Sequence, residues 1–423
     1  MKKIKIKLPN YIQILIGMFL GIATGFVLHK LELDKIAIDW IKPFGTIFIK
    51  ALKMIAIPLV FVSLIKGILG VKNIKELSSM GLKTIGIYIL TTFIAVMLGV
   101  VAVNVVNPGK FFPQDKSIQF KQQIENAAAQ QVNVENSAKD DSPLTFLVDM
   151  VPENITSAMG NNSMMLQVIF LAILFGIAIL SIGTSKMKSL MDVVDSVNLV
   201  LLKVIDFIMK CAPLGVFALM TTLFIDTSGD MDVFASLGVY AATVIGCLLL
   251  LIYGVYPLFI HFFSNVKISK FIKSMIPVQL VAFSTSSSAA TLPVNMEQCN
   301  KELGLSSKST SFVLPVGVTI NMDGTSCYQA ISIIFIAQVM GMDLTMAQTI
   351  SIILLTILSS IGTPGVPGAS IVMAVMVLGS IGIPAEGLVL ILGIDRPLDM
   401  VRTVVNVTGD AAVASIIDKS VSK

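Results

Sequence analysis

The chain has 423 residues, of which 55% are hydrophobic and 13% charged, with a net charge of +4 and a mean hydropathy of +0.88. Soluble globular chains carry about 25% charged residues, so this composition excludes a water-soluble fold, and the charge gives no indication of a nucleic-acid partner. The apolar residues gather in runs near the roughly 20 residues that a bilayer-spanning helix needs. The sequence therefore predicts an all-α polytopic membrane protein.

Six apolar runs before residue 261 have the length of membrane-spanning helices. They cover residues 11–28, 44–70, 84–107, 164–183, 194–225 and 233–260. The basic start of the chain has the character of a signal-peptide n-region, but no small-residue cleavage site follows the first run, so we expect this run to stay as a helix. The polar stretch 108–145 predicts an exposed loop.

Lysines gather at the N-terminus and after every second run. They are Lys2, Lys3, Lys5, Lys7, Lys72, Lys75, Lys83, Lys186, Lys188, Lys267, Lys270 and Lys273. Cytoplasmic loops of membrane proteins carry an excess of Lys and Arg. The pattern therefore predicts a multi-pass protein of the cell (inner) membrane with both termini in the cytoplasm.

The C-terminal part contains two uncharged segments with polar or Gly/Pro-rich interruptions. Residues 274–296 are interrupted by the serine tract 284–288, and residues 349–378 by Gly362-Thr-Pro-Gly-Val-Pro-Gly368. Neither half of either segment is long enough to span a bilayer, and irregular backbone at membrane depth occurs only against protein or a water-filled cavity. We expect two re-entrant helical hairpins, although the serine tract alone is also compatible with a flexible loop.

A long helical segment follows each hairpin, at 309–340 and at about 386–417. We expect both segments to be interrupted, the first at Asn321-Met-Asp-Gly-Thr325 and the second at Asn406-Val-Thr-Gly-Asp410. The total is then eight transmembrane helices plus two hairpins. Because the hairpins start from opposite sides, the two hairpin–helix units form an inverted repeat, which marks the binding site of many transporters.

The last helix carries five charged residues within 16 positions: Asp395, Arg396, Asp399, Arg402 and Asp410. A charge at the bilayer centre costs at least about 2.5–3.5 kcal/mol and marks a functional site by default. Asp399, Arg402 and Asn406 are three and four residues apart, so they share one helix face. We expect this polar stripe to line a cavity. Two alternatives would also explain the charges: an ion-pair ladder between helices, or a helix that lies outside the membrane.

An arginine in this cavity is suited to binding a carboxylate with two hydrogen bonds, and an aspartate one turn away is suited to an ammonium group. Together Arg402 and Asp399 predict an acidic amino acid as the substrate. The broken helix around Asp323 offers carbonyl oxygens and one carboxylate, an oxygen site that suits sodium better than calcium. Asp410 offers a second site of this kind. The alternative is that Asp323 pairs with a lysine.

These residues resemble the dicarboxylate/amino acid:cation symporter family, the glutamate transporter family, and its prokaryotic sodium-coupled aspartate/glutamate transporters. The resemblance rests on Lys53-Met-Ile-Ala-Ile-Pro58, Tyr88-Ile-Leu-Thr-Thr92, the serine-rich hairpin tip and the two Asn/Asp/Gly motifs. It covers most of the chain but not residues 108–145.

The resemblance implies a substrate site between the hairpin tips and the last helix. Arg402 would bind the side-chain carboxylate with Thr325 beside it, and Asp399 would bind the amino group. The rest of the substrate would be held by Asn406, Thr403, Ser287, Ser288, Val366, Pro367, Gly368 and Ala369.

Sodium ions, co-transported with the substrate, are the implied cofactors. One would lie at Asp410 with carbonyl oxygens of Gly317, Asn321 and Asn406. Another would be held by carbonyl oxygens of Thr319, Ser360, Ile361 and Thr363. A third would use Tyr88, Thr91, Thr92, Asn321, Met322 and Asp323.

The resemblance also implies a homotrimer in the lipid bilayer with an elevator mechanism, in which the second hairpin is the gate. The scaffold would comprise residues 1–81 and 146–228, and the moving transport part would comprise 82–107 and 229–423, with 108–145 as the exposed loop.

Differences within the family narrow the function. C4-dicarboxylate carriers lack the aspartate at position 399, and neutral amino acid carriers lack the arginine at position 402, so Asp399 and Arg402 indicate aspartate or glutamate. Gln329 stands where animal members couple a proton through glutamate. Ser286 stands where archaeal members carry an arginine, and Arg396 supplies one from the last helix. The alternative is a proton-coupled glutamate/aspartate or C4-dicarboxylate symporter. A channel would need a ring-forming filter and an intramembrane enzyme a catalytic set, and the charged pattern of the last helix matches neither.

Overall fold

The computed structural model describes residues 10–70, 78–118, 121–122, 151–161, 164–183, 186–363, 365 and 368–421. Within these ranges every regular element is a helix, as the all-α prediction requires. Six helical stretches are long and apolar enough to cross a bilayer. They are Ile12–Lys30, Asp34–Lys66, Met80–Phe111, Lys188–Asp226, Met231–Phe263 and Val389–Ser420.

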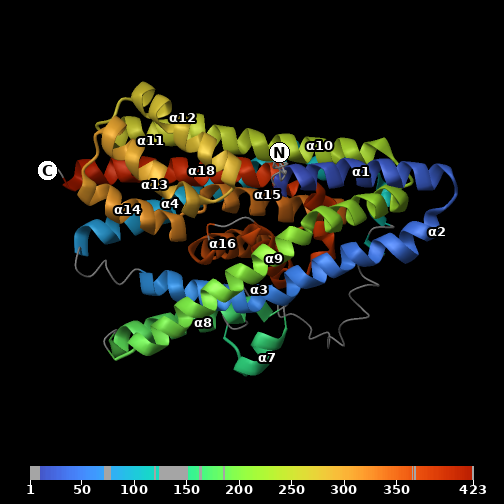
Figure 1. Cartoon of the computed structure of the whole chain (residues 1–423), viewed down its shortest axis with the longest axis horizontal. Coiled ribbons are helices and arrows are strands. Elements are labelled where there is room, and N and C mark those ends of the chain that lie inside the picture. The colour runs from blue at the N-terminus through green and yellow to red at the C-terminus, as the bar shows by residue number, and fades with distance from the viewer. Residues whose placement is uncertain are drawn as a thin grey trace, which may run out of the picture.

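One group of helices consists of α1 (Asn10–Lys30), α3 (Lys42–Gly70), α8 (Met165–Ile182) and α9 (Lys188–Asp226). The 39-residue α9 runs diagonally across the molecule and packs against both α1 and α3, while α8 packs against α3 (Figure 1). The contact between α1 and α9 depends on glycine, because a Cβ atom on Gly17 would lie 2.5 Å from the carbonyl oxygen of Pro213. Small residues of this kind let membrane helices approach closely. The short elements α2 (Asp34–Ile36), η1 (Ala37–Ile41) and α7 (Ile155–Gly160) complete this half.

A second group packs around α18 (Val389–Val421), which contacts α10 (Met231–Leu250), α11 (Tyr256–Phe263), α12 (Ile268–Thr285), α14 (Ser307–Ile320) and α15 (Asp323–Val339). In the apolar stretch of α18 94% of the residues are buried within the protein, against 28% in that of α1. The charged helix therefore forms the protein-enclosed centre of this group and α1 lies at the periphery (Figure 1). The group also includes α4 (Ser78–Val106), η3 (Pro108–Phe111), η5 (Leu251–Val255), η6 (Cys299–Leu303) and η7 (Ala385–Leu388).

Both expected hairpins have a helix–turn–helix form. The first consists of α12 and α13 (Ser288–Gln298), and the second of α16 (Met346–Gly362) and α17 (Ala369–Ser380). In the first turn Ser286 is left-handed, with φ of 49°, and Ser287 caps α13 by accepting from the amide of Ala290 at 3.2 Å. In the second turn Gly368 has φ of +83°, a conformation that favours glycine. No arm exceeds 18 residues.

The two predicted helix interruptions have different outcomes. The chain does leave the helix at Asn321 and Met322, between α14 and α15. The interruption predicted at 406–410 is wrong, because α18 is one continuous helix from Val389 to Val421. A glycine inside a helix costs only about 1 kcal/mol relative to alanine. Gly409 serves close packing instead, since a Cβ atom there would lie 2.7 Å from the hydroxyl of Tyr256.

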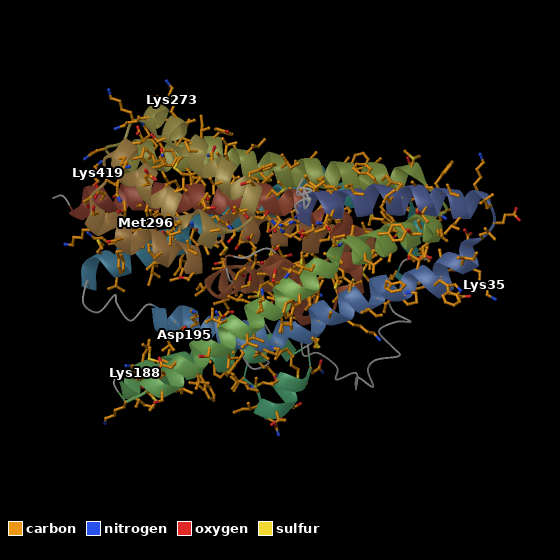
Figure 2. All side chains as sticks on the ribbon, in the orientation of Figure 1. Lys35, Lys188, Asp195, Lys273, Met296 and Lys419 are labelled. Atoms are coloured by element: carbon orange, nitrogen blue, oxygen red, sulfur yellow. The ribbon has the colours of Figure 1, made fainter. Side chains whose placement is uncertain are left out.

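Lysines of different segments lie at the same end of the molecule. Figure 2 shows Lys188, Lys273 and Lys419 toward one end of the long axis and Lys35 at the other. This agrees with the predicted grouping of the basic segment ends, and the assignment of that end to the cytoplasm stays a prediction. Lys2, Lys3, Lys5, Lys7, Lys72 and Lys75 and most of the loop 108–145 lie outside the described residues.

Candidate functional site

Four charged side chains of α18 form one buried ion-pair network. Arg396 Nη1 donates to Asp399 Oδ2 at 2.8 Å, and Arg402 Nη2 donates to Asp399 Oδ1 at 2.9 Å. Arg402 Nη2 also lies 3.0 Å from Asp395 Oδ1, and its guanidinium lies 3.8 Å from the centre of the Tyr328 ring. The four charged residues are at most 7% exposed. Two arginines and two aspartates cancel in charge, which makes the burial of each one tolerable.

Arg402, which we expect to bind a substrate carboxylate, is paired with two aspartates of its own helix in this structure. Arg402 is fully buried and is held by both aspartates, with only Nη1 and Nε lacking a hydrogen-bond partner among the described residues. Asp395 contacts Arg402 rather than its neighbour Arg396. The reason is helical geometry: residues seven apart lie on the same face two turns along, whereas adjacent residues point in different directions.

A small polar cavity lies where α18, the α14–α15 break and both hairpin turns meet. It is lined by Asp399, Thr403 and Asn406 of α18, by Met322 and Thr325 at the break, and by Ser286, Ser288, Thr363, Gly365 and Ser370 of the hairpins. Five predicted substrate residues are thus brought together: Asp399, Thr403, Asn406, Thr325 and Ser288. Arg402 is absent from the lining, but it is hydrogen-bonded to Asp399, which does line the cavity.

The hairpin turns contact each other. Ser287 Oγ donates to the carbonyl oxygen of Gly365 at 2.8 Å, and the amide of Ala289 lies 3.5 Å from the same oxygen. Ser287 is therefore engaged in capping and in this contact and does not line the cavity. Gly368 and Ala369 are buried at the start of α17, with Gly368 against Met209 of α9. The predicted residues Val366 and Pro367 lie outside the described residues.

Asp323 is buried at the start of α15 and accepts hydrogen bonds from three hydroxyl groups. They belong to Thr92 at 2.7 Å, Thr91 at 3.3 Å and Tyr256 at 2.9 Å. In the described part of the chain no lysine or arginine forms an ion pair with Asp323, so the predicted lysine alternative is not seen. Tyr88 lies nearby and donates to the carbonyl of Val313 at 3.0 Å. A fully buried carboxylate with only neutral partners is suited to a cation.

Asp410 is a second buried carboxylate with an oxygen-rich neighbourhood. Asn321 Nδ2 donates to Asp410 Oδ1 at 2.8 Å, while Asn321 Oδ1 is buried with no partner among the described residues. A Cβ atom on Gly317 would lie 2.3 Å from Asp410 Oδ1 and 2.5 Å from the Tyr88 hydroxyl, so only glycine fits there. The side-chain Nδ2 of Asn321 also donates to the backbone carbonyl oxygen of Asn406 at 3.4 Å. A carboxylate, an unpaired amide oxygen and nearby carbonyls fit a small hard cation.

The predicted cation set of Thr319, Ser360, Ile361 and Thr363 also comes together, at the end of α16 and the end of α14. Ser360 Oγ lies 3.5 Å from the carbonyl oxygen of Ile320, the residue after Thr319, and Ile361 follows Ser360 in α16. Thr363 is buried and lines the cavity. This set is made of backbone carbonyl and hydroxyl groups without a carboxylate.

Several residues at the site were not among the sequence-derived candidates. Tyr256 and Tyr328 reach Asp323 and Arg402 from positions that look like ordinary apolar-run aromatics. The sequence signal for Ser286 was its difference from the archaeal pattern. Gln329 links both arms of the second hairpin to α15, since Nε2 donates to the carbonyl of Ser370 at 3.3 Å and Oε1 accepts from Ser359 at 2.9 Å.

A largely apolar all-helical chain with a polar cavity between two helical hairpins, a broken helix and a charged central helix has the architecture of a secondary transporter. The model of the sodium:dicarboxylate symporter family matches residues 11–420. The chain belongs to this family, and it is a multi-pass membrane transporter.

Relatives named as transporters cover nearly the whole chain. The proton/sodium-glutamate symport protein of Bacillus caldotenax is 36% identical over 410 residues, covering 96% of this chain and 93% of the relative. The proton/glutamate-aspartate symporter of Escherichia coli (strain K12) is 35% identical and covers 99% and 94%. The C4-dicarboxylate transport protein of Deinococcus deserti is 31% identical and covers 97% and 89%.

Proposed function

We propose that this protein is a secondary active symporter that imports aspartate or glutamate together with sodium ions. The observation that carries the proposal is Asp399, a buried carboxylate that lines the cavity and is hydrogen-bonded to Arg402 behind it. A dicarboxylate alone has no positive group for Asp399, whereas an amino acid has one. Relatives named as glutamate or glutamate-aspartate symporters support acidic amino acids as the substrate class.

Substrate binding would exchange partners within the ion-pair network. The ammonium group would bind Asp399 and take the place of one arginine contact, and the freed Arg402 Nη2, together with the unpaired Nη1, would bind the side-chain carboxylate. The Tyr328 ring also lies against the guanidinium of Arg402, which would hold its orientation during the exchange. Because charges are exchanged rather than newly buried, the desolvation penalty of the bound state stays small.

Sodium ions would bind near Asp323 and Asp410 and compensate carboxylates that have only neutral partners. Coupling to the substrate would run through the α14–α15 break. Asn406 Oδ1 accepts from the amide of Gly324 at 2.9 Å, and its Nδ2 lies 3.2 Å from Met322 Sδ. Asn406 and Met322 both line the cavity, so a cation that orders this break also shapes the substrate site.

The two helix groups would act as the scaffold and transport parts of an elevator in a homotrimer, with the boundaries 1–81 and 146–228 for the scaffold and 82–107 and 229–423 for the transport part. The packing supports this division, because α9 packs against α1 and α3, while α18 packs against the first hairpin and α15, and the second hairpin packs against α15. The contacts of α16 and α17 with α3, and of α18 with α9, would form the sliding interface.

The proposal is tested by uptake of labelled aspartate and glutamate into proteoliposomes under separate sodium and pH gradients. We expect a sodium gradient alone to drive uptake of both. The runner-up is proton coupling, which the names of several relatives include; uptake driven by a pH gradient in sodium-free buffer would establish it and overturn sodium coupling. Uptake of succinate but of neither amino acid would establish a C4-dicarboxylate symporter instead.

A further inference from the structure

Four lysines from two distant parts of the chain meet at the corner between α11 and α12. Lys267 directly precedes α12, Lys270 and Lys273 lie in its first two turns, and all three are exposed. Lys419, near the end of α18, reaches the same corner, because its Nζ donates to the carbonyl oxygen of Ser264 at 3.4 Å. Figure 2 shows Lys273 and Lys419 toward the same end of the molecule. We call Lys267, Lys270, Lys273 and Lys419 the lysine corner.

The lysine corner lacks an acidic partner within the described parts of the chain. None of its four ammonium groups forms an ion pair there. Asp418, the nearest acidic residue in the sequence, is engaged with another loop, since its Oδ1 accepts from the amide of Ser306 at 3.1 Å. The exposed lysines of α9 differ, because Lys203 and Lys210 lie 2.9 and 3.0 Å from Asp206. The lysine corner therefore carries four uncompensated positive charges, which attract an anion.

Both helices that meet at the lysine corner carry exposed apolar side chains. At the end of α11 the Phe262 ring is 63% exposed. On α12 three exposed apolar residues follow Lys273 at spacings of three or four: Ile276, Leu280 and Phe283. Residues at these spacings share one side of a helix. This side of α12 is therefore charged at the lysine corner and apolar along the rest of its length.

An anionic phospholipid matches this layout. Its phosphate accepts hydrogen bonds from lysine ammonium groups, and its acyl chains pack against apolar side chains below the headgroups. A zwitterionic lipid carries its own cation beside the phosphate, so four unpaired lysines favour a headgroup with net negative charge. Basic clusters beside a membrane helix attract such lipids, with about a fivefold gain in affinity for each lysine. A soluble phosphate would use the lysines but not the apolar side of α12.

We infer that the lysine corner and the apolar side of α12 form a binding site for an anionic phospholipid. The lipid stabilises α12, which is the first arm of the first hairpin and leads to Ser286 at the cavity. The site lies outside the cavity, and its existence does not depend on which substrate the protein transports. Through α12, the bound lipid connects the membrane to the hairpin that lines the substrate site.

The test measures thermal unfolding of the purified full-length protein in neutral detergent, with added phosphatidylglycerol, phosphatidylcholine or glycerol phosphate. Native mass spectrometry counts the lipids that stay bound. We expect phosphatidylglycerol to stabilise the wild type at lower concentration than phosphatidylcholine, and glycerol phosphate to have no effect. In the triple variant Lys267→Gln, Lys270→Gln, Lys273→Gln the phosphatidylglycerol concentration for half-maximal stabilisation should rise about a hundredfold. Arginine at the same three positions keeps the charge and should retain the wild-type response.

Lys203→Gln combined with Lys210→Gln is the matched control, because these exposed lysines already have Asp206 as a partner. It should respond to phosphatidylglycerol as the wild type does. A wild-type response in the triple glutamine variant would overturn the site. Equal effects of the two lipids on the wild type, a comparison that needs no variant, would overturn the selection for negative charge. Stabilisation by glycerol phosphate would overturn the assignment to a lipid. Since neither substrate nor sodium gradient enters the test, each of these results leaves the proposed transport function intact.

Discussion

Replacing Asp399 by serine tests whether this carboxylate binds the ammonium group of the substrate. In the substrate-free protein the change removes the 2.8 Å contact to Arg396 and the 2.9 Å contact to Arg402, while Arg402 keeps its 3.0 Å contact to Asp395. That loss concerns the free protein and is the same whichever ligand is added afterwards. The ratio of the affinities for two ligands therefore isolates the ammonium interaction.

The two ligands are aspartate and succinate, which differ by the ammonium group. A hydrogen bond between charged groups contributes about 1.5–3 kcal/mol, and each 1.4 kcal/mol is a factor of ten in a dissociation constant. We expect the affinity of Asp399→Ser for aspartate to fall about 10- to 150-fold. Its affinity for succinate should be retained or rise, because Arg402 has one competing carboxylate less.

The assay is competition for binding to the purified protein at fixed, saturating sodium. Asp206→Ser is the matched control: this aspartate also lies between two cations, 2.9 Å from Lys203 and 3.0 Å from Lys210, but on the exposed surface of α9. It should leave both affinities unchanged. Equal losses for aspartate and succinate in Asp399→Ser would refute the ammonium role of Asp399.

Three further changes address the cation sites and the second hairpin. Asp410→Asn removes a buried negative charge beside the unpaired Asn321 oxygen, so the sodium concentration for half-maximal binding of aspartate should rise about tenfold or more, since a charged partner contributes about 1.5–3 kcal/mol. Tyr256→Phe removes the 2.9 Å hydrogen bond to Asp323 and should lower stability by about 1–3 kcal/mol, measured by thermal unfolding. Gln329→Glu needs a proton on its carboxyl group to donate to the Ser370 carbonyl as the amide does, so uptake should be highest at low pH and fall as pH rises.

Each of these expectations has a result that contradicts it. An unchanged sodium dependence in Asp410→Asn would exclude this carboxylate from cation binding. A Tyr256→Phe protein as stable as the wild type would mean that the hydroxyl contributes nothing to holding Asp323. A pH-independent Gln329→Glu would show that the amide contact to the second hairpin is dispensable.

The sequence by itself determined the class of fold and the residue types of the site. Apolar runs of bilayer length and two interrupted segments predict helices and hairpins because these patterns are local. The same holds for the break at Asn321, where a short polar motif stands inside an apolar helix. Position 409 shows the limit of local evidence: glycine in a helix marks a break or a close contact equally well, and only the nearby Tyr256 hydroxyl decides for contact.

Only the tertiary structure decided which charges are paired and which polar groups are free. Five charged positions between residues 395 and 410 of α18 are visible in the sequence, but the pairing of Arg402 with Asp395 depends on two turns of helix and on the Tyr328 ring of another helix. Likewise, Ser286 and Ser370 are ordinary serines until two hairpins bring them to one cavity without partners. Hydrogen-bond satisfaction depends on neighbours distant in the chain, so no local pattern can encode it.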